Sequence, residues 1–178
     1  MKDLKRLYVE GGTYFFTVVT NKRRKLLCEE ESRLALNTAI KHVRSTHPFD
    51  IVAWVLLPDH LHCIWTLPQG DANFSLRWSL IKRSVSYQLK EKFDIRSDRT
   101  ENQIKKRESG FWQHRFWEHS INNETDLTRH FNYVHFNPVK HGLVETTNEW
   151  QWSTFHRYLR MGYYDDERMP IDENVDGE

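Results

Sequence analysis

The chain contains few cysteines and no long hydrophobic run. Its only two cysteines among 178 residues, Cys28 and Cys63, lie far apart in the sequence and fit no zinc-binding spacing. We therefore expect reduced thiols in a protein of the cytoplasm. No apolar segment is long enough to span a bilayer, and the first residues do not resemble a secretory signal. Neither membrane insertion nor secretion is expected.

Net charge is also low, but it is unevenly distributed. The formal net charge is +1, yet residues 165–178 contain seven acidic residues and one basic residue. This segment therefore carries −6, and residues 1–164 carry +7. A basic body suits a polyanionic partner such as nucleic acid. We expect a single domain over residues 1–164, long enough to bury a hydrophobic core, followed by a flexible acidic tail.

Hydrophobic periodicity predicts four strands and three helices. The expected strands lie at residues 14–20, 49–57, 60–67 and 111–121, and the expected helices at 32–44, 76–93 and 124–136. The polar segment 94–110 is expected to be a loop. The first six elements follow the β-α-β-β-α-β order of a ferredoxin-like sandwich. We therefore predict an α+β fold with an added C-terminal helix, which by itself indicates no function.

Two histidines, His60 and His62, begin the third predicted strand directly after a Pro58-Asp59 turn. Alternate residues of a strand share one face, so both imidazoles point the same way with roots roughly 6–7 Å apart. Imidazoles at this spacing can bind one metal ion together. Two polar residues on the wet face of a half-exposed sheet would give the same pattern.

The third predicted helix contains Tyr133 and Asn137, which lie on one helical face because they are four residues apart. Asn137 precedes Pro138, so we expect the helix to end there. A tyrosine hydroxyl with a pKa near ~10 needs activation to act as a nucleophile, and a metal that polarises a phosphate provides it. Alternatively, Tyr133 is an ordinary half-buried aromatic residue and Asn137 an ordinary helix end.

Several motifs together resemble those of the REP-associated tyrosine transposases, in the single-tyrosine branch of the HUH nuclease superfamily. The matching segments occur in the same order over about residues 8–164, at residues 57–62, 112–113, 116, 118–119, 133–144 and 150–155. The resemblance implies that His60 and His62 bind a divalent ion and that Tyr133, on the added helix, is the catalytic nucleophile. It places a third metal ligand at Asn137.

The resemblance further implies a metal-dependent endonuclease and strand transferase, a transposase that acts on single-stranded hairpin DNA of the REP type. A 5′-phosphotyrosine would be its intermediate. Mg²⁺ or Mn²⁺ is the expected ion, because mixed imidazole and oxygen ligands with open water positions suit both. No small-molecule cofactor is expected. We expect a monomer or a homodimer in the bacterial cytoplasm, associated with the nucleoid.

Basic side chains are the candidates for contact with DNA, although a solvated surface would explain the same charges. The candidates are Lys22, Arg23, Arg24, Lys25, Arg77, Lys82, Arg83 and Lys140. Two other functions also fit the sequence. One is a non-catalytic RNA- or DNA-binding module, because the RNA recognition fold has the same strand order. The other is a metal-dependent phosphodiesterase that uses water instead of a tyrosine.

Overall fold

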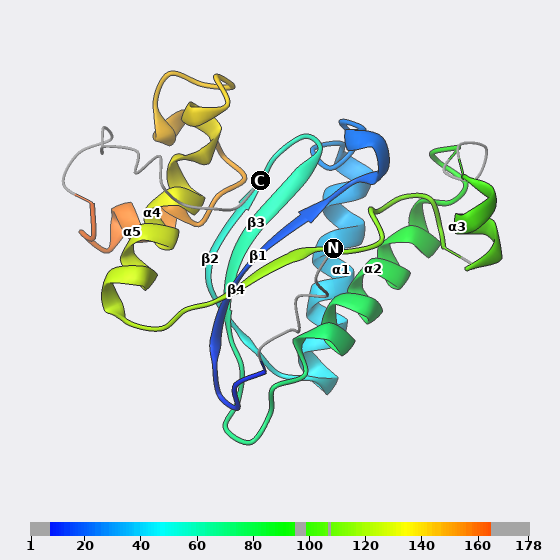
Figure 1. Cartoon of the computed structure of the whole chain (residues 1–178). Helices are drawn as coiled ribbons and strands as arrows, with labels where there is room; N and C mark the ends of the chain where they lie inside the picture. Colours follow the sequence, from blue (N-terminus) through cyan, green and yellow to red (C-terminus); the bar gives the residue numbers. More distant parts are fainter. Residues whose placement is uncertain (1–7, 95–98, 107, 165–178) are drawn as a thin grey trace.

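The structure is a computed structural model that describes residues 8–94, 99–106 and 108–164 (Figure 1). Its centre is a four-stranded antiparallel sheet in the order β2-β3-β1-β4. The strands are β1 (Thr13–Val19), β2 (Asp50–Leu56), β3 (His60–Thr66) and β4 (Trp117–Ser120). The helices are η1 (Asn21–Arg23), α1 (Glu30–Thr46), α2 (Phe74–Leu89), α3 (Glu101–Lys105), α4 (Glu124–Lys140), η2 (Thr147–Glu149) and α5 (Phe155–Arg160). The predicted ferredoxin-like α+β fold is confirmed.

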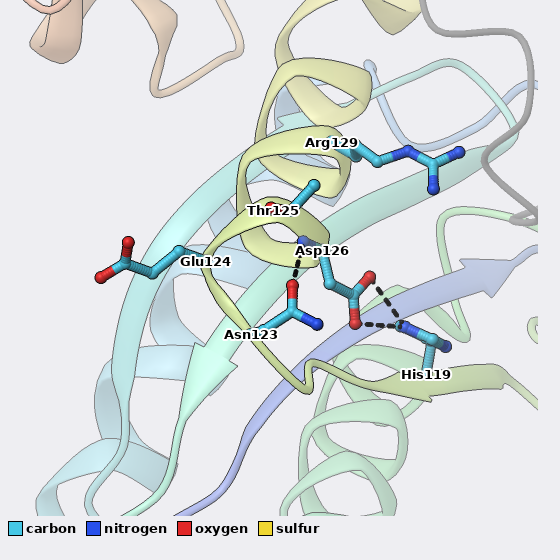
Figure 2. A pocket seen from close by; sticks show the side chains of 6 residues that line it. All are labelled: His119, Asn123, Glu124, Thr125, Asp126 and Arg129. Atoms are coloured by element: carbon cyan, nitrogen blue, oxygen red, sulfur yellow. Dashed lines mark hydrogen bonds and ion pairs between the residues drawn. The ribbon is translucent and has the colours of Figure 1, made fainter.

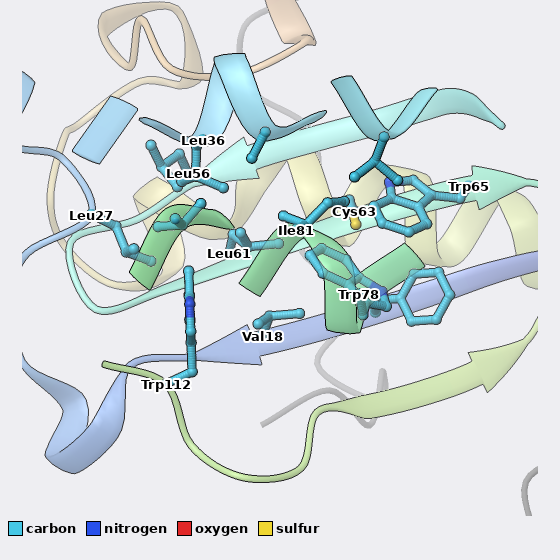
Figure 3. Close-up of a cluster of buried hydrophobic side chains, with 14 of the residues drawn as sticks. Val18, Leu27, Leu36, Leu56, Leu61, Cys63, Trp65, Trp78, Ile81 and Trp112 are labelled. Carbon is cyan, nitrogen blue, oxygen red and sulfur yellow. The ribbon is translucent and has the colours of Figure 1, made fainter. Parts of the chain in front are cut away.

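One face of the sheet is covered by α1 and α2 (Figure 1). Side chains alternate along a strand, so Phe16 of β1 and Leu61 of β3 both point to this face and pack with Trp78 of α2. Figure 3 shows this larger core, in which the Trp65 and Trp78 rings stack with centroids 4.2 Å apart. Burial of these aromatic residues stabilises the scaffold that carries the opposite face.

The opposite face of the sheet is covered by α4 and α5 (Figure 1). Phe15 of β1 and Ile64 of β3 point to this face and form a second core with Phe131 and Val134 of α4. A ferredoxin-like sheet with helices on one face only would leave these residues exposed. Helix α4 therefore completes the second core, and its side chains are the ones that face β3.

The predicted end of the tyrosine helix is wrong. The helix continues through Pro138 to Lys140 instead of ending before the proline. A proline inside a helix removes one backbone hydrogen bond and crowds the preceding turn. Here the next bond is already restored, because the His141 amide donates to the Asn137 carbonyl at 3.0 Å. Burial of Phe136 and Pro138 holds the last turn in place.

The last predicted strand is also shorter than expected. Residues 117–120 pair with β1, whereas Trp112 forms only an isolated bridge with Thr20. The next paired position is Thr17 with Trp117. Trp112 and Trp117 are thus five residues apart, whereas their partners Thr20 and Thr17 are three residues apart. Residues 113–116 between the bridge and β4 are irregular. The predicted loop 94–110 contains the short helix α3.

Residues 165–178, the predicted acidic tail, lie outside the described residues, and the proposed division into a domain and a tail stays a prediction. Across the residues that the structure describes, no helix has the length and hydropathy needed to cross a membrane.

Candidate active site

His60 and His62 lie side by side on the face of β3 that α4 covers. Their rings are nearly perpendicular, at 81°, with centroids 4.8 Å apart. Leu61 and Cys63 belong to the core on the other face, as the strand periodicity predicts. Both histidines are buried, so they are not the wet-face residues of a half-exposed sheet.

Each histidine is held at Nδ1 by a neighbouring oxygen. Asp59 Oδ1 lies 2.7 Å from Nδ1 of His60 and accepts a hydrogen bond from its N–H, because a carboxylate oxygen has no proton to donate. Thr17 Oγ1 of β1 lies 2.8 Å from Nδ1 of His62. Among the contacts of the described residues, the Nε2 atoms of both rings are buried and have no hydrogen-bond partner. A ring fixed through Nδ1 presents the Nε2 lone pair to a ligand, as in histidines that bind metal ions.

Helix α4 and the residue that follows it, His141, carry three polar side chains on the face that meets this histidine pair. The Tyr133 ring lies 5.2 Å from the His62 ring, and the His141 ring lies 5.1 Å from the His60 ring. Asn137 lies between them on the same helical face, one turn from each. It is fully buried, and within the described structure neither atom of its amide has a partner. The structure thus brings together all four residues predicted for catalysis and metal binding.

Burial keeps the two imidazoles neutral. It lowers the pKa of His60, although the adjacent Asp59 carboxylate opposes the shift. It lowers the pKa of His62 far more, and electrostatic interactions with His60, His141 and Lys140 add to the effect. Burial alone would raise the Asp59 pKa, but the hydrogen bonds from His60 and Arg23 outweigh it and lower that pKa. Neutral imidazoles are the form that coordinates a metal ion, so no proton has to leave first.

The donor set therefore fits a divalent ion. In the described structure two neutral imidazole nitrogens and one amide group are buried and unpaired, and Asn137 lies on the helix face between the two residues whose rings contact the histidine pair. Leaving such polar atoms unpaired in the interior is costly without a ligand. Imidazole with amide oxygen and open positions suits Mn²⁺ and related ions better than it suits the closed tetrahedral site of structural zinc.

A second cluster, formed by His119 of β4 with Asp126 and His130 of α4, also has metal-ligand chemistry. Figure 2 shows the His119 and Asp126 side chains of this cluster. Its geometry fits an ion poorly. The two imidazole rings stack with centroids 4.5 Å apart and only 13° between their planes, so one ion cannot lie in both ring planes. Asp126 already bonds His119 Nε2 at 2.9 Å and pairs with His130 Nδ1 at 3.0 Å. This trio, the His119–Asp126–His130 clasp, ties the edge strand to the first turns of α4.

Some of the predicted basic residues lie at the histidine end of the site. The segment Lys22–Lys25 follows β1, whose last residue Val19 pairs with His60. Arg23 lies 3.2 Å from the Asp59 carboxylate, and Lys22 and Arg23 adopt positive φ angles of 55° and 50°. Arg24 binds the Gly110 carbonyl. Lys140 Nζ lies 4.8 Å from the centre of the Tyr133 ring.

The predicted basic residues of α2 do not reach the site. Arg77 is only 1% exposed and is held by Asp71 and by three backbone carbonyls. The expectation that it contacts DNA is corrected, because a guanidinium buried in this way cannot reach a phosphate. Lys82 donates to the carbonyls of Gln113 and His114, and Arg83 shares its helix on the opposite face of the sheet from α4.

The sequence alone did not identify three sets of residues. Asp59 is adjacent to His60, so a carboxylate beside a predicted ligand was an available signal. Asp126 and His130 have the i, i+4 spacing of a helical pair. Thr17 gave no local signal, because only the register of β1 with β3 places it beside His62.

Comparison with known proteins gives a consistent result. The family described as "Transposase IS200 like" matches residues 8–137. A REP-associated tyrosine transposase of Escherichia coli K12 is 41% identical over 172 residues, which cover 97% of this chain and 90% of the relative. A Haemophilus influenzae relative is 38% identical over 167 residues, covering 92% and 91%. A solved REP-associated tyrosine transposase bound to a REP hairpin has a TM-score of 0.82 at 40% identity and covers 100% of this chain and 98% of that one.

A ferredoxin-like sheet with paired histidines beneath a tyrosine-bearing helix is the arrangement of a single-tyrosine nuclease of the transposase class. The chain belongs to the IS200-like transposase family and, within it, to the REP-associated tyrosine transposases.

Proposed function

We propose that the protein is a transposase that cleaves and rejoins single-stranded DNA at hairpins of the REP type, with Tyr133 as nucleophile. The contact of the Tyr133 ring with His62, beside two unpaired Nε2 atoms, is the observation that supports this most strongly. Family membership and the hairpin bound to the solved relative support the choice of DNA.

His60, His62 and Asn137 would hold a divalent ion, Mg²⁺ or Mn²⁺. When bound, such an ion polarises a non-bridging oxygen of the scissile phosphate. Thr17 and Asp59 keep the two imidazoles oriented, and burial keeps them neutral.

Tyr133 then acts on the phosphorus in line with the leaving group. Its oxygen loses a proton and bonds to phosphorus, while the bond from phosphorus to the 3′ oxygen breaks and that oxygen takes up a proton. A 5′-phosphotyrosine and a free 3′-hydroxyl remain. A second 3′-hydroxyl reverses the step on another strand, so the reaction needs no nucleotide cofactor. The Lys140 ammonium lies 4.8 Å from the centre of the Tyr133 ring, where it would attract the phosphate.

One chain is sufficient for this chemistry in our proposal. Tyr133 contacts His62 of its own chain, which supports a monomer that acts in cis rather than a homodimer that exchanges helices. Lys22, Arg23, Lys25 and Lys140 are the basic residues proposed to hold DNA beside the site. Access to chromosomal hairpins is consistent with a location at the nucleoid of the bacterial cytoplasm.

The two other functions make different demands on the sheet. RNA recognition modules use an open sheet face with exposed aromatic residues. Here α4 covers that face, and Phe15 beneath it is fully buried. A water-using phosphodiesterase would not need a tyrosine against the histidine pair.

Incubation with a 5′-labelled and a 3′-labelled REP hairpin in Mn²⁺, followed by a denaturing gel, tests the proposal. We expect cleavage only with metal and a slow-migrating protein–DNA adduct that keeps the label on the 3′ side of the cut. Cleavage without an adduct would indicate the phosphodiesterase, and binding without cleavage the non-catalytic module. Either result would overturn the proposal.

A further inference from the structure

Trp117 lies on the same cross-strand row as the histidine site but is not covered by α4. In the sheet register Thr17 pairs with His62 on one side and with Trp117 on the other. Directly paired residues point to the same face, so the three side chains form one row. Trp117 therefore stands two strand spacings, about 10 Å, from His62. It is 39% exposed, whereas Phe15 on the same face is fully buried.

Trp117 is held in position from below and from one side. Its ring contacts Phe15 edge-on at 5.6 Å and lies parallel to the His119 ring, with an angle of 8° and centroids 5.9 Å apart. The His119 ring stacks in turn on His130. Asp126 fixes both imidazoles through the clasp described above. The irregular segment 113–116 ends at Trp117, the first residue of β4.

A positive charge stands beside this ring column. Arg129 and His119 line one open hollow between β4 and α4, and Figure 2 shows both side chains on the same side of the helix. Arg129 lies one helical turn before Tyr133. A guanidinium matches the geometry of a phosphate group. The hollow reaches from His119, on which the Trp117 ring stacks, to Arg129, and the carboxylates of Glu124 and Asp126 also line it.

We propose that Trp117 and Arg129 form a nucleotide subsite that binds the unpaired DNA strand next to the scissile phosphate. The base stacks on Trp117, and its phosphate pairs with Arg129. This inference rests on the proposed function, because only a single-stranded substrate at Tyr133 would pass over the row. Because the indole ring is already held in place, it loses little conformational freedom when a base stacks on it. The ring column is therefore a preorganised platform.

The test measures binding separately from cleavage. Full-length Tyr133→Phe protein is titrated with REP hairpins that carry single-stranded flanks, with 2-aminopurine at each flank position in turn. A second series carries an abasic site at each position. We expect one position whose 2-aminopurine fluorescence is quenched on binding and whose abasic form binds more weakly.

Substitutions then locate that position on the protein. Trp117→Ala should abolish the quenching and weaken binding about 5- to 150-fold. The same change should have little effect on the abasic hairpin, since no base is left to stack. Trp117→Phe should retain part of the affinity and shows that loss of folding is not the cause. Tyr87→Ala removes an exposed aromatic residue from α2, on the opposite face, and should bind like the parent.

Arg129→Gln should weaken every flanked hairpin alike and lower the slope of log affinity against log salt by about one. Lys41→Gln on α1 is the matched control for the lost charge. Unchanged quenching and affinity in Trp117→Ala, or an equal loss on the intact and abasic hairpins, would overturn the subsite. If the unsubstituted protein, with Tyr133 intact, forms the adduct in that case, the proposed function stands and only the subsite fails.

Discussion

Single hydrogen bonds decide whether His60 and His62 are ready to bind an ion. Thr17 and Asp59 would touch neither DNA nor metal, yet they fix the ring orientation through Nδ1. Loss of such an orienting partner typically lowers metal affinity about 10- to 100-fold.

Replacement of Thr17 by valine should show this effect. Thr17→Val keeps the shape of the side chain but removes the hydroxyl beside His62, so Mn²⁺ affinity should fall by about 10- to 100-fold. Thr17→Ser keeps the hydroxyl and should bind almost as the parent does. Calorimetric titration of Mn²⁺ into each protein, without DNA, measures this affinity. Equal affinity of the valine and serine variants would exclude an orienting role.

His135 should make the fold sensitive to acid. It is buried on the far side of α4, where Nδ1 bonds the Tyr164 hydroxyl at 2.7 Å and Nε2 bonds Thr154 at 2.8 Å. Burial, with a smaller effect of the Arg157 charge, lowers its pKa to about 3. The unfolded chain takes up a proton at this position below about pH 6.5, and the folded chain does not. The stabilisation is therefore complete above pH 6.5 and decreases as the pH falls toward 3.

Denaturant unfolding between pH 7 and pH 4 measures this contribution. The free energy of unfolding should fall by roughly 1 kcal/mol per pH unit from His135 alone. His135→Gln should be less stable at pH 7 but show a correspondingly smaller slope. His42→Gln, on the exposed surface of α1, is the control. Parallel slopes for the parent and His135→Gln would contradict the buried neutral histidine.

At the scale of elements, the start of α4 should matter more for catalysis than the start of α2. Both helices have an asparagine N-cap: Asn123 accepts from the Asp126 amide at 2.9 Å, and Asn73 from the Leu76 amide at 3.0 Å. Either change to alanine should lower the free energy of unfolding by about 1 kcal/mol. Only Asn123→Ala loosens the turn that carries the clasp and leads to Tyr133.

Cleavage assays well below the melting temperature therefore separate the two variants. Asn123→Ala should lose activity several-fold, and Asn73→Ala should cleave like the parent. The same loss in both would mean that stability alone, rather than the position of α4, controls the rate.

Elements with a local pattern could be predicted from the sequence. His60 and His62 share a face because strands have a period of two, and Tyr133 and Asn137 share one because helices turn every 3.6 residues. The predicted ends of helices and strands were wrong where packing against residues distant in the sequence determines them. Pro138 stays helical because its turn is buried, and Trp112 leaves the sheet because its ring belongs to the core formed with α2.

The sequence suggested which side chains to propose as ligands, but it did not reveal the residues around them. The contact between Thr17 and His62 joins residues 45 positions apart and depends on strand register. The burial of Arg77 depends on the backbone carbonyls of His47 and Pro48, which no charge pattern reveals.

At the scale of the whole molecule, charge should govern DNA affinity. Residues 1–164 carry +7 and residues 165–178 carry −6. A polyanionic segment competes with DNA for the same positive surface, so truncation after Tyr164 should tighten hairpin binding. Because salt screens both interactions, the gain should shrink as the salt concentration rises. Titration of the hairpin into the full-length and the truncated protein, at low and at moderate salt, measures this gain in affinity. Equal affinities of the two proteins at both salt concentrations would show that the segment does not compete with DNA.

The central claim is that Tyr133 is the nucleophile, and the covalent adduct tests it most directly. The adduct formed with a hairpin in Mn²⁺ is digested, and the peptide that carries the nucleotide is sequenced by mass spectrometry. We expect the nucleotide on Tyr133, no adduct with Tyr133→Phe, and a normal adduct with the control Tyr163→Phe, whose ring is exposed. Hairpin affinity of Tyr133→Phe should remain close to that of the parent. A nucleotide on any other tyrosine, or an adduct formed by Tyr133→Phe, would contradict the account.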